Sequence, residues 1–390
     1  MAVRHFSAIR LAALAFATVG VLLATACTQG QANLPYGWSG PAVSNGVIYA
    51  AIKGGRIVVM DRDGGAILSR FPGASDKRTP LGAYGDPVLK DGVLYFGAFN
   101  GKVYALKQPT KDELDEQRKL SGNRDREVPG LQSLWEYPAG DTNPEHRIVS
   151  GIAVTDDAVF FGATDKKLHA VDAAKGQTEL WRPFETGGEI WSTPAVADGV
   201  VYVGSQDHNL YAVDAKTGKE LWRFETQGPV IASPVVVDGV VYVGSFDKRF
   251  YAIDTTSHQK LWDFEGSNWF WSRPLVANGV VYVGGLDHKL YARDAKSGAE
   301  VWTNESPNGP IRSTPVIAGD LVIVGTDEKK VYAVDKTSGA FRWYYETNGA
   351  VAGPLFYDGE RVVFSSLDGN NTVYVLNPAS SQGPGYTTYK

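Results

Sequence analysis

Hydrophobic positions recur along the chain in blocks of about 40 residues, a period typical of repeat architectures. Each block holds four short runs of β-branched or aromatic residues. In one block these runs are Pro194–Ala197, Val200–Gly204, Leu210–Val213 and Glu220–Phe224. Asp198-Gly199 separates the first two runs and is typical of a tight hairpin, because glycine tolerates positive φ. The pattern predicts four-stranded antiparallel units.

Eight such blocks fill the chain from Trp38 to Lys390. In seven of them a proline opens the first run, and in the remaining block Ile152 takes its place; the prolines are Pro41, Pro87, Pro194, Pro234, Pro274, Pro315 and Pro354. Eight four-stranded units predict an all-β, eight-bladed β-propeller that forms a single domain over residues 37–390. The outer strand of the last blade has two candidate sources, Tyr386–Tyr389 or the residues just before Trp38.

A second motif spans the third turn of each block and the run that follows it. In one block it reads Ala212-x-Asp214-x-x-Thr217-Gly218-x-x-x-Trp222. This motif resembles the tryptophan-docking repeat of the PQQ-like β-propeller family. There the Asp caps the turn, the Gly takes a left-handed conformation, and the Trp fills the wedge between blades. We therefore assign a structural role to the motif tryptophans Trp181, Trp222, Trp262, Trp302 and Trp343.

The amino terminus predicts export. Residues 1–26 combine two arginines with an apolar run from Leu11 to Ala24, which is shorter than the ~20 residues of a membrane-spanning helix. Cys27 follows Ala24-Thr25-Ala26 and resembles the lipidated cysteine of a bacterial lipoprotein, with residues 27–36 as a tether, although Ala24 stands where such signals usually carry leucine. Ordinary secretion with cleavage at these small residues is the alternative.

Charge and cysteine content exclude several classes of site. The formal net charge is −5, and it becomes −7 once the two arginines of residues 1–26 are removed, which argues against nucleic-acid binding and against attraction to anionic lipid. Cys27 is the only cysteine, so an internal disulfide or a Cys/His zinc site is excluded. Any membrane attachment is therefore expected to come from the lipid alone.

A candidate binding mouth follows from the position three residues before each proline. In a propeller the inner strand begins there, so this side chain is expected near the opening of the central channel. Around the ring the position holds Trp38, Tyr84, Val149, Trp191, Ile231, Trp271, Arg312 and Val351. With their neighbours, the predicted binding residues are Trp38, Tyr84, Trp191, Trp269, Phe270, Trp271, Arg273 and Arg312. The alternative is that the rings only plug the channel.

Two further features have a structural and a functional interpretation. Acidic or amide residues recur after the second run as Asn100, Asp165, Asp207, Asp247, Asp287 and Glu328. We interpret them as turn-capping residues rather than metal ligands, and expect no metal site. Residues 107–133 interrupt the second block between its third and fourth runs, with a charged, helix-prone segment from Thr110 to Leu120. This insertion is either a solvated loop or a partner contact.

No catalytic motif accompanies the repeats: His-Glu-x-x-His, Gly-x-Ser-x-Gly, the P-loop and Gly-x-Gly-x-x-Gly are all missing from the sequence. Length, repeat type and Cys27 resemble the BamB-type lipoproteins of the outer-membrane β-barrel assembly machinery. This resemblance implies a monomeric, non-catalytic scaffold without cofactor, anchored to the outer membrane on its periplasmic side or to the outer face of the plasma membrane, with protein partners in the envelope. The alternatives are a ligand-sensing propeller and a PQQ-dependent dehydrogenase, whose adjacent cysteine pair is missing.

Overall fold

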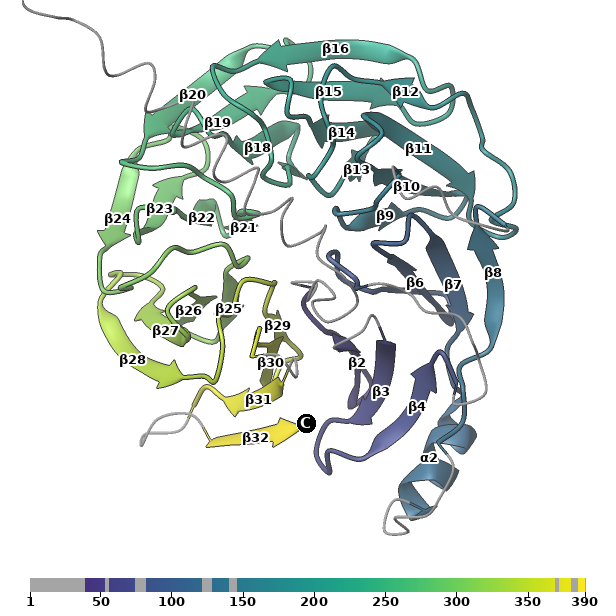
Figure 1. The fold of residues 1–390 in the computed structure, drawn as a ribbon. Coiled ribbons are helices and arrows are strands. Elements are labelled where there is room, and N and C mark those ends of the chain that lie inside the picture. The colour runs from purple at the N-terminus through teal and green to yellow at the C-terminus, as the bar shows by residue number, and fades with distance from the viewer. Residues whose placement is uncertain are drawn as a thin grey trace, which may run out of the picture.

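The computed structural model describes residues 39–52, 56–73, 82–120, 128–139, 146–368, 372–379 and 385–389. Eight four-stranded antiparallel sheets follow one another around a central axis, as Figure 1 shows. The structure confirms the predicted eight-bladed β-propeller. The expected signal peptide, Cys27, the tether and Trp38 lie outside the described residues. No helix among the described residues is long and apolar enough to cross a membrane.

Each blade runs in chain order from an inner strand at the axis to an outer strand at the rim. The first four blades consist of β1 (Ala42–Ser44), β2 (Val47–Ile52), β3 (Arg56–Asp61) and β4 (Ile67–Phe71); β5 (Val88–Lys90), β6 (Val93–Gly97), β7 (Val103–Lys107) and β8 (Ser133–Tyr137); β9 (Ile152–Val154), β10 (Ala158–Gly162), β11 (Lys167–Asp172) and β12 (Phe184–Glu185); and β13 (Ala195–Ala197), β14 (Val200–Gly204), β15 (Asn209–Asp214) and β16 (Glu220–Glu225).

The last four blades repeat this order. They consist of β17 (Val235–Val237), β18 (Val240–Gly244), β19 (Arg249–Asp254) and β20 (Lys260–Glu265); β21 (Leu275–Ala277), β22 (Val280–Gly284), β23 (Leu290–Asp294) and β24 (Glu300–Asn304); β25 (Val316–Ala318), β26 (Leu321–Gly325), β27 (Lys330–Asp335) and β28 (Phe341–Glu346); and β29 (Phe356–Tyr357), β30 (Val362–Ser365), β31 (Val373–Asn377) and β32 (Gly385–Tyr389).

The docking tryptophans lie between consecutive blades. Trp181 donates its indole N–H to the Ala215 carbonyl of the next blade at 3.1 Å, and a Cβ on Gly218 would stand only 2.5 Å from the same ring. Only glycine allows this close approach, and its φ of 69° is also the left-handed conformation that glycine favours. Equivalent contacts join Trp262 to Gly298 and Trp302 to Gly339. The motif thus couples blades 3, 5 and 6 to their successors.

Three members of the docking series depart from the simple pattern. Trp222 meets His258 in place of glycine, and the two rings stack at 5.0 Å with φ of His258 at 61°. Trp343 is only partly buried against the last blade. Trp135 in blade 2 belongs to the series although the sequence motif did not predict it, because it donates to the Ala173 carbonyl at 3.0 Å.

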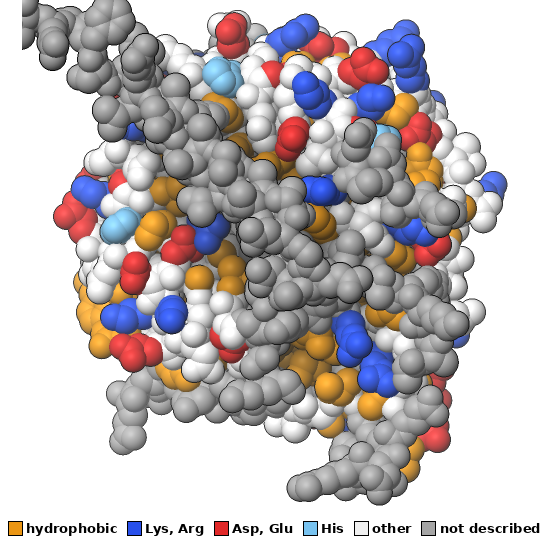
Figure 2. Space-filling view, in the orientation of Figure 1, with side chains coloured by type: hydrophobic (Ala, Val, Ile, Leu, Met, Phe, Trp, Pro, Cys, Tyr) orange, Lys and Arg blue, Asp and Glu red, His pale blue; other side chains and the backbone are white. Residues whose placement is uncertain are grey.

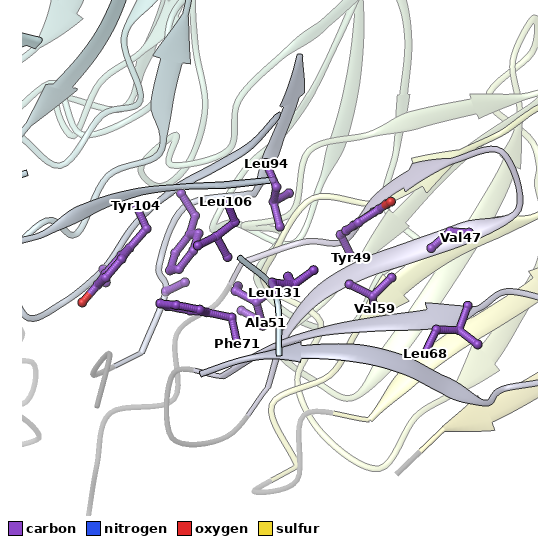
Figure 3. Close-up of a cluster of buried hydrophobic side chains, with 14 of the residues drawn as sticks. Val47, Tyr49, Ala51, Val59, Leu68, Phe71, Leu94, Tyr104, Leu106 and Leu131 are labelled. Carbon is purple, nitrogen blue, oxygen red and sulfur yellow. The ribbon is translucent and has the colours of Figure 1, made fainter. Parts of the chain in front are cut away.

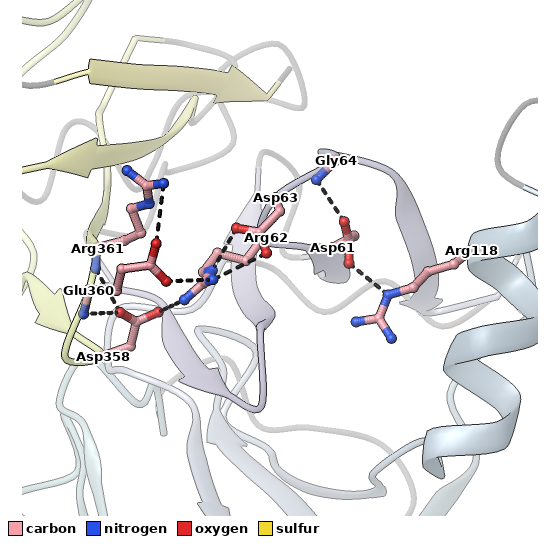
Figure 4. A network of polar contacts seen from close by, with 8 residues as sticks. All are labelled: Asp61, Arg62, Asp63, Gly64, Arg118, Asp358, Glu360 and Arg361. Atoms are coloured by element: carbon pink, nitrogen blue, oxygen red, sulfur yellow. Dashed lines mark hydrogen bonds and ion pairs between the residues drawn. The ribbon is translucent and has the colours of Figure 1, made fainter.

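The ring closes between the first and the last blade. Of the two candidate segments, the carboxyl-terminal one supplies the outer strand of blade 8, since β32 pairs with β31. Arg62 at the β3–β4 turn bonds to Asp358 at 2.7 Å and to Glu360 at 3.0 Å, both in the β29–β30 turn (Figure 4). Blade 1 is therefore joined to blade 8 by these ion pairs and by a cluster of non-aromatic apolar side chains, whereas most other junctions use an aromatic ring.

The insertion in blade 2 packs against blade 1. Its helix α2 (Lys111–Leu120) starts with a capping box, in which Thr110 and Glu113 bond to each other's backbone N–H. Leu114 is buried in the hydrophobic cluster between the first two blades, part of which Figure 3 shows. Arg118 bonds to Asp61 of blade 1 at 2.7 Å (Figure 4). The helix is therefore packed against blade 1 through Leu114 and Arg118, while most of its other side chains are exposed to solvent, and a partner contact there stays a prediction.

The insertion occupies a place that other blades fill with tryptophan. In blade 1 the docking position holds Ser69, whose hydroxyl donates to the Pro129 carbonyl of the insertion at 3.0 Å. The Leu131 N–H donates to the Arg70 carbonyl at 2.7 Å, and Leu131 is buried in the same cluster as Leu68 (Figure 3). The insertion thus substitutes for the missing indole at the first blade junction. Residues 121–127 lie outside the described part of the chain.

Candidate docking site at the channel mouth

The segments that lead into the inner strands line the central channel. Successive side chains of an extended segment alternate in direction, so the residues three and one before each proline point the same way. A cavity of about 80 Å³ lies there on the axis. Its lining combines the outer layer of Tyr84, Val149, Trp191, Ile231, Trp271 and Arg312 with an inner layer of Asp86, Gly151, Thr193, Ser233, Arg273 and Thr314. The structure therefore brings Tyr84, Trp191, Trp271, Arg273 and Arg312 together, as the sequence predicts.

Aromatic rings make up much of the outer layer. Trp191 and Trp271 are both partly exposed, and their ring centroids lie 6.3 Å apart. Trp269 stacks on Phe246 at 4.6 Å, and Phe246 also contacts Trp271 at 5.5 Å. We call these four residues with Tyr84 and Arg312 the channel mouth. Phe246 was not predicted from the sequence. A signal was present, because the equivalent positions of the neighbouring blades hold Gln206 and Leu286, which are not aromatic.

Polar contacts hold the mouth in place. The Arg312 guanidinium bonds to Asp327 at 2.9 Å and lies 5.7 Å from the centre of the Trp271 ring, so its charge is shared between a carboxylate and an aromatic face. The Trp191 indole N–H donates to Glu189 at 2.8 Å. The two tryptophans are thereby oriented before any partner arrives. Pre-oriented side chains lose less conformational entropy on binding than mobile ones.

Two of the predicted binding residues do not line the cavity, and a third lies outside the described residues. Phe270 is fully buried and packs against Phe250, Phe264 and Tyr291 with centroid distances of 5.3 to 5.9 Å. The prediction for Phe270 is wrong because it is one residue out of phase with Trp271 and points into the blade. Trp269 joins the mouth through Phe246 rather than by lining the cavity. Trp38 lies outside the described residues, so its place in the mouth stays a prediction.

The recurring acids bind backbone and tyrosine groups. Asp207 accepts the Gly187 N–H at 2.6 Å and the Tyr211 hydroxyl at 2.8 Å, and its other oxygen accepts the Asn209 N–H at 3.1 Å. Asp247 and Asp287 repeat this arrangement in the next two blades. These contacts support the turn-capping interpretation. Within the described residues, no group of three or more His, Cys, Asp and Glu is arranged to hold a metal ion.

Basic and acidic side chains are interspersed over the described part of the face seen in Figure 2, with hydrophobic side chains between them. Because positive and negative side chains alternate on this face, it does not create an electrostatic field of one sign that would attract charged ligands.

A profile of the family described as outer membrane protein assembly factor BamB matches residues 28–182, 178–303 and 287–382. The chain belongs to the BamB family. BamB from Moraxella catarrhalis superposes with a TM-score of 0.65 at 19% identity, over 86% of this chain and 92% of that one. The computationally designed Ika8 protein gives a TM-score of 0.68 at 19% identity, over 88% and 97%. No curated protein sequence gave a significant match. At this identity, both structures show the fold alone.

Proposed function

We propose that this BamB-family protein is a non-catalytic scaffold of the cell envelope that docks a protein partner at the channel mouth. In a host with an outer membrane, we propose outer-membrane protein assembly as its setting. Membership of the family supports this role. The observation that carries the docking proposal is the mouth itself, where Trp191 and Trp271 line a cavity beside Arg312 and Trp269 extends the aromatic surface.

The chemistry of the mouth suits a protein surface. Tryptophan, tyrosine and arginine dominate the energetic centres of protein interfaces, because they bury large areas at a small cost in side-chain entropy. The cavity of about 80 Å³ admits a single side chain or a few atoms. Sites for cofactors and drug-sized ligands usually enclose about 300–1,000 Å³. The dimensions therefore favour an inserted side chain over a bound quinone cofactor.

Removing two of the mouth aromatics is expected to weaken partner capture strongly. The double variant Trp269→Ala/Trp271→Ala removes two partly exposed anchors, and losing about 2 kcal/mol of binding energy weakens affinity about 30-fold. The measurement is affinity capture from detergent-solubilised native membranes, followed by titration of the recovered partner. The matched control is Leu221→Ala/Leu261→Ala, which removes two exposed hydrophobic side chains from outer strands.

The same experiment separates the proposal from its alternatives. Circular dichroism establishes that both variants fold. Equal capture by wild type and the Trp269/Trp271 variant would show that the rings only fill the channel. Recovery of a small molecule without any protein would favour the sensing propeller.

Anchoring through Cys27 is a second expectation of the proposed role. Cys27→Ala should move the mature protein from the membrane fraction to the soluble envelope fraction, because the net charge of −7 does not attract the chain to anionic lipid in place of the anchor. The measurement is immunoblotting of fractionated cells. The matched control is Thr28→Ala, which changes the next residue and leaves the cysteine in place. Membrane retention of Cys27→Ala equal to that of wild type would contradict the anchor.

A further inference from the structure

A ring of residues one layer below the mouth also lines the cavity. Each member directly precedes the proline position of its blade, and we call this ring the bore. Three pairs of neighbouring members bond to each other across blade junctions. The Gly40 N–H donates to Asp86 at 2.5 Å, the Gly151 N–H to the Thr193 hydroxyl at 2.9 Å, and the Thr193 N–H to the Ser233 hydroxyl at 2.9 Å. Side-chain oxygens of the bore thus accept backbone N–H groups across blade junctions.

Arg273 interrupts this ring. A guanidinium has five donors and no acceptor, so Arg273 cannot receive the bond that the preceding hydroxyl residues receive. The Arg273 side chain is accessible to solvent from the cavity but is surrounded by protein. The resulting desolvation lowers the pKa of Arg273, although the negative charge of Asp86 acts to raise it. Within the described part of the chain, Arg273 makes no hydrogen bond or ion pair. It therefore presents to the cavity a cation that has no directly bonded counter-ion.

Asp86 faces Arg273 from the opposite side. Asp86 belongs to blade 2 and Arg273 to blade 6, four blades apart in a ring of eight. Burial raises the pKa of Asp86 to about 6, although the Gly40 N–H and the Arg273 charge both act to lower it. Near pH 7.5 the carboxylate is thus mainly ionised. Among the described residues no ion pair joins the two groups, so their charges act across the cavity.

The charge balance of the bore selects a particular kind of ligand. A simple anion attracted by Arg273 would meet the Asp86 carboxylate, and a simple cation attracted by Asp86 would meet Arg273. Arg312 does not alter this balance, because Asp327 already neutralises it. A ligand that carries both charges satisfies both groups. The cavity of about 80 Å³ has room for about six water molecules, so the ligand must be small.

We propose that the bore binds a small zwitterion of the amino-acid type, with its carboxylate on Arg273 and its ammonium group on Asp86. The Thr193, Ser233 and Thr314 side chains supply further polar contacts around the cavity. The zwitterion and an inserted partner side chain would share this cavity and compete for it, but binding of alanine to the purified chain does not require the docking role proposed above. Partner capture and ligand binding are therefore separately measurable.

Isothermal titration of the purified full chain with alanine at pH 7.5 tests this proposal. We expect saturable binding of alanine, and at least tenfold weaker binding of acetate and of ethylammonium at equal ionic strength. Arg273→Thr and Asp86→Asn should each weaken alanine binding at least tenfold. Both variants suit the fold, because threonine occupies the same position in two other blades and asparagine keeps the oxygen that accepts the Gly40 N–H. The control is Arg223→Thr, which replaces an exposed arginine on β16.

Lowering the pH adds an independent measurement. Alanine binding should weaken as the pH falls through about 6, because protonated Asp86 no longer attracts the ammonium group. Asp86→Asn should remove this dependence. Heat capacity scans establish that the variants are folded. The proposal is overturned if alanine shows no saturable binding, if acetate binds as tightly as alanine, or if Arg273→Thr retains wild-type affinity.

Discussion

Trp222→Ala should lower the free energy of unfolding by about 3–5 kcal/mol, the range for deleting a buried aromatic side chain. Trp222 is only 9% exposed and packs against Tyr202 of its own blade, with ring centroids 5.8 Å apart. It also stacks on His258 of the next blade. Alanine would remove contacts on both sides of a blade junction, and neighbouring sheets cannot close the gap without shifting against each other.

Two substitutions serve as references for this measurement by urea unfolding. Leu221 precedes Trp222 on β16 but is 50% exposed, so Leu221→Ala should change stability by less than about 0.5 kcal/mol. Trp343 has the same place in its repeat and is only partly buried, so Trp343→Ala should cost less than Trp222→Ala. An unfolding midpoint for Trp222→Ala equal to that of Leu221→Ala would contradict the docking role.

Repetition is the reason that so much of the fold was predictable. Each strand, turn and docking tryptophan occurs several times, so a local ambiguity in one block is resolved by comparison with the others. The blade with Val200–Gly204 has its strands within a residue or two of the predicted runs. The eight-bladed ring then follows from counting. Trp135 was missed because the insertion separates it from the rest of its motif.

Features that occur once were harder to predict. Closure by β32 and the Arg62 ion pairs depend on where the chain ends meet, which no repeat specifies. The sequence did contain a signal for the packing of the insertion against blade 1. Blade 1 has Ser69 at the position where most other blades have the docking tryptophan. The mouth residues were predicted from their position relative to the inner strands. Phe270 was placed wrongly because successive side chains of an extended segment point in opposite directions, so the neighbour of Trp271 points into the blade. The sequence does not indicate that Asp86 and Arg273 share a cavity, because this depends on blades 2 and 6 lying on opposite sides of the ring.

The junction between blades 2 and 3 contains a buried charge cluster. His169 lies between two carboxylates, with Nε2 at 3.0 Å from Asp165 and Nδ1 at 2.9 Å from Glu179. The Tyr137 hydroxyl of blade 2 donates to the same Glu179 oxygen at 2.6 Å, and His146 approaches Asp165 at 3.9 Å. The imidazole also stacks on Phe161 at 4.9 Å. An imidazole whose two nitrogens both contact carboxylates can donate both hydrogen bonds only when it is protonated.

The pKa shifts of the cluster agree with that arrangement. Burial acts to lower the pKa of His169, but the bonds to Asp165 and Glu179 outweigh it, and the pKa is raised. Burial acts to raise the pKa values of Asp165 and Glu179, but His169 holds both below their usual range. The stabilisation from His169 is therefore complete below about pH 6.5 and is lost as pH rises through the raised value. The carboxylate contributions are lost as pH falls below about 4.

His169→Leu should cost about 3–5 kcal/mol of folding stability at pH 6, because it leaves two carboxylates at a blade junction without their cation. His169→Tyr should recover much of this loss. Tyrosine is the residue that blades 4, 5 and 6 use at this position, where Tyr211, Tyr251 and Tyr291 donate to Asp207, Asp247 and Asp287. The measurement is urea unfolding of wild type and both variants between pH 6 and pH 9.

The pH dependence distinguishes a charged cluster from simple packing. Wild type should lose stability relative to His169→Tyr as pH rises above about 6.5, since only wild type releases the imidazole proton. A packing role for His169 predicts a constant difference between the two proteins at every pH. Equal stability of His169→Leu and wild type at pH 6 would likewise contradict the ionic role. The expected slope would show that the stability of this junction depends on the protonation of His169.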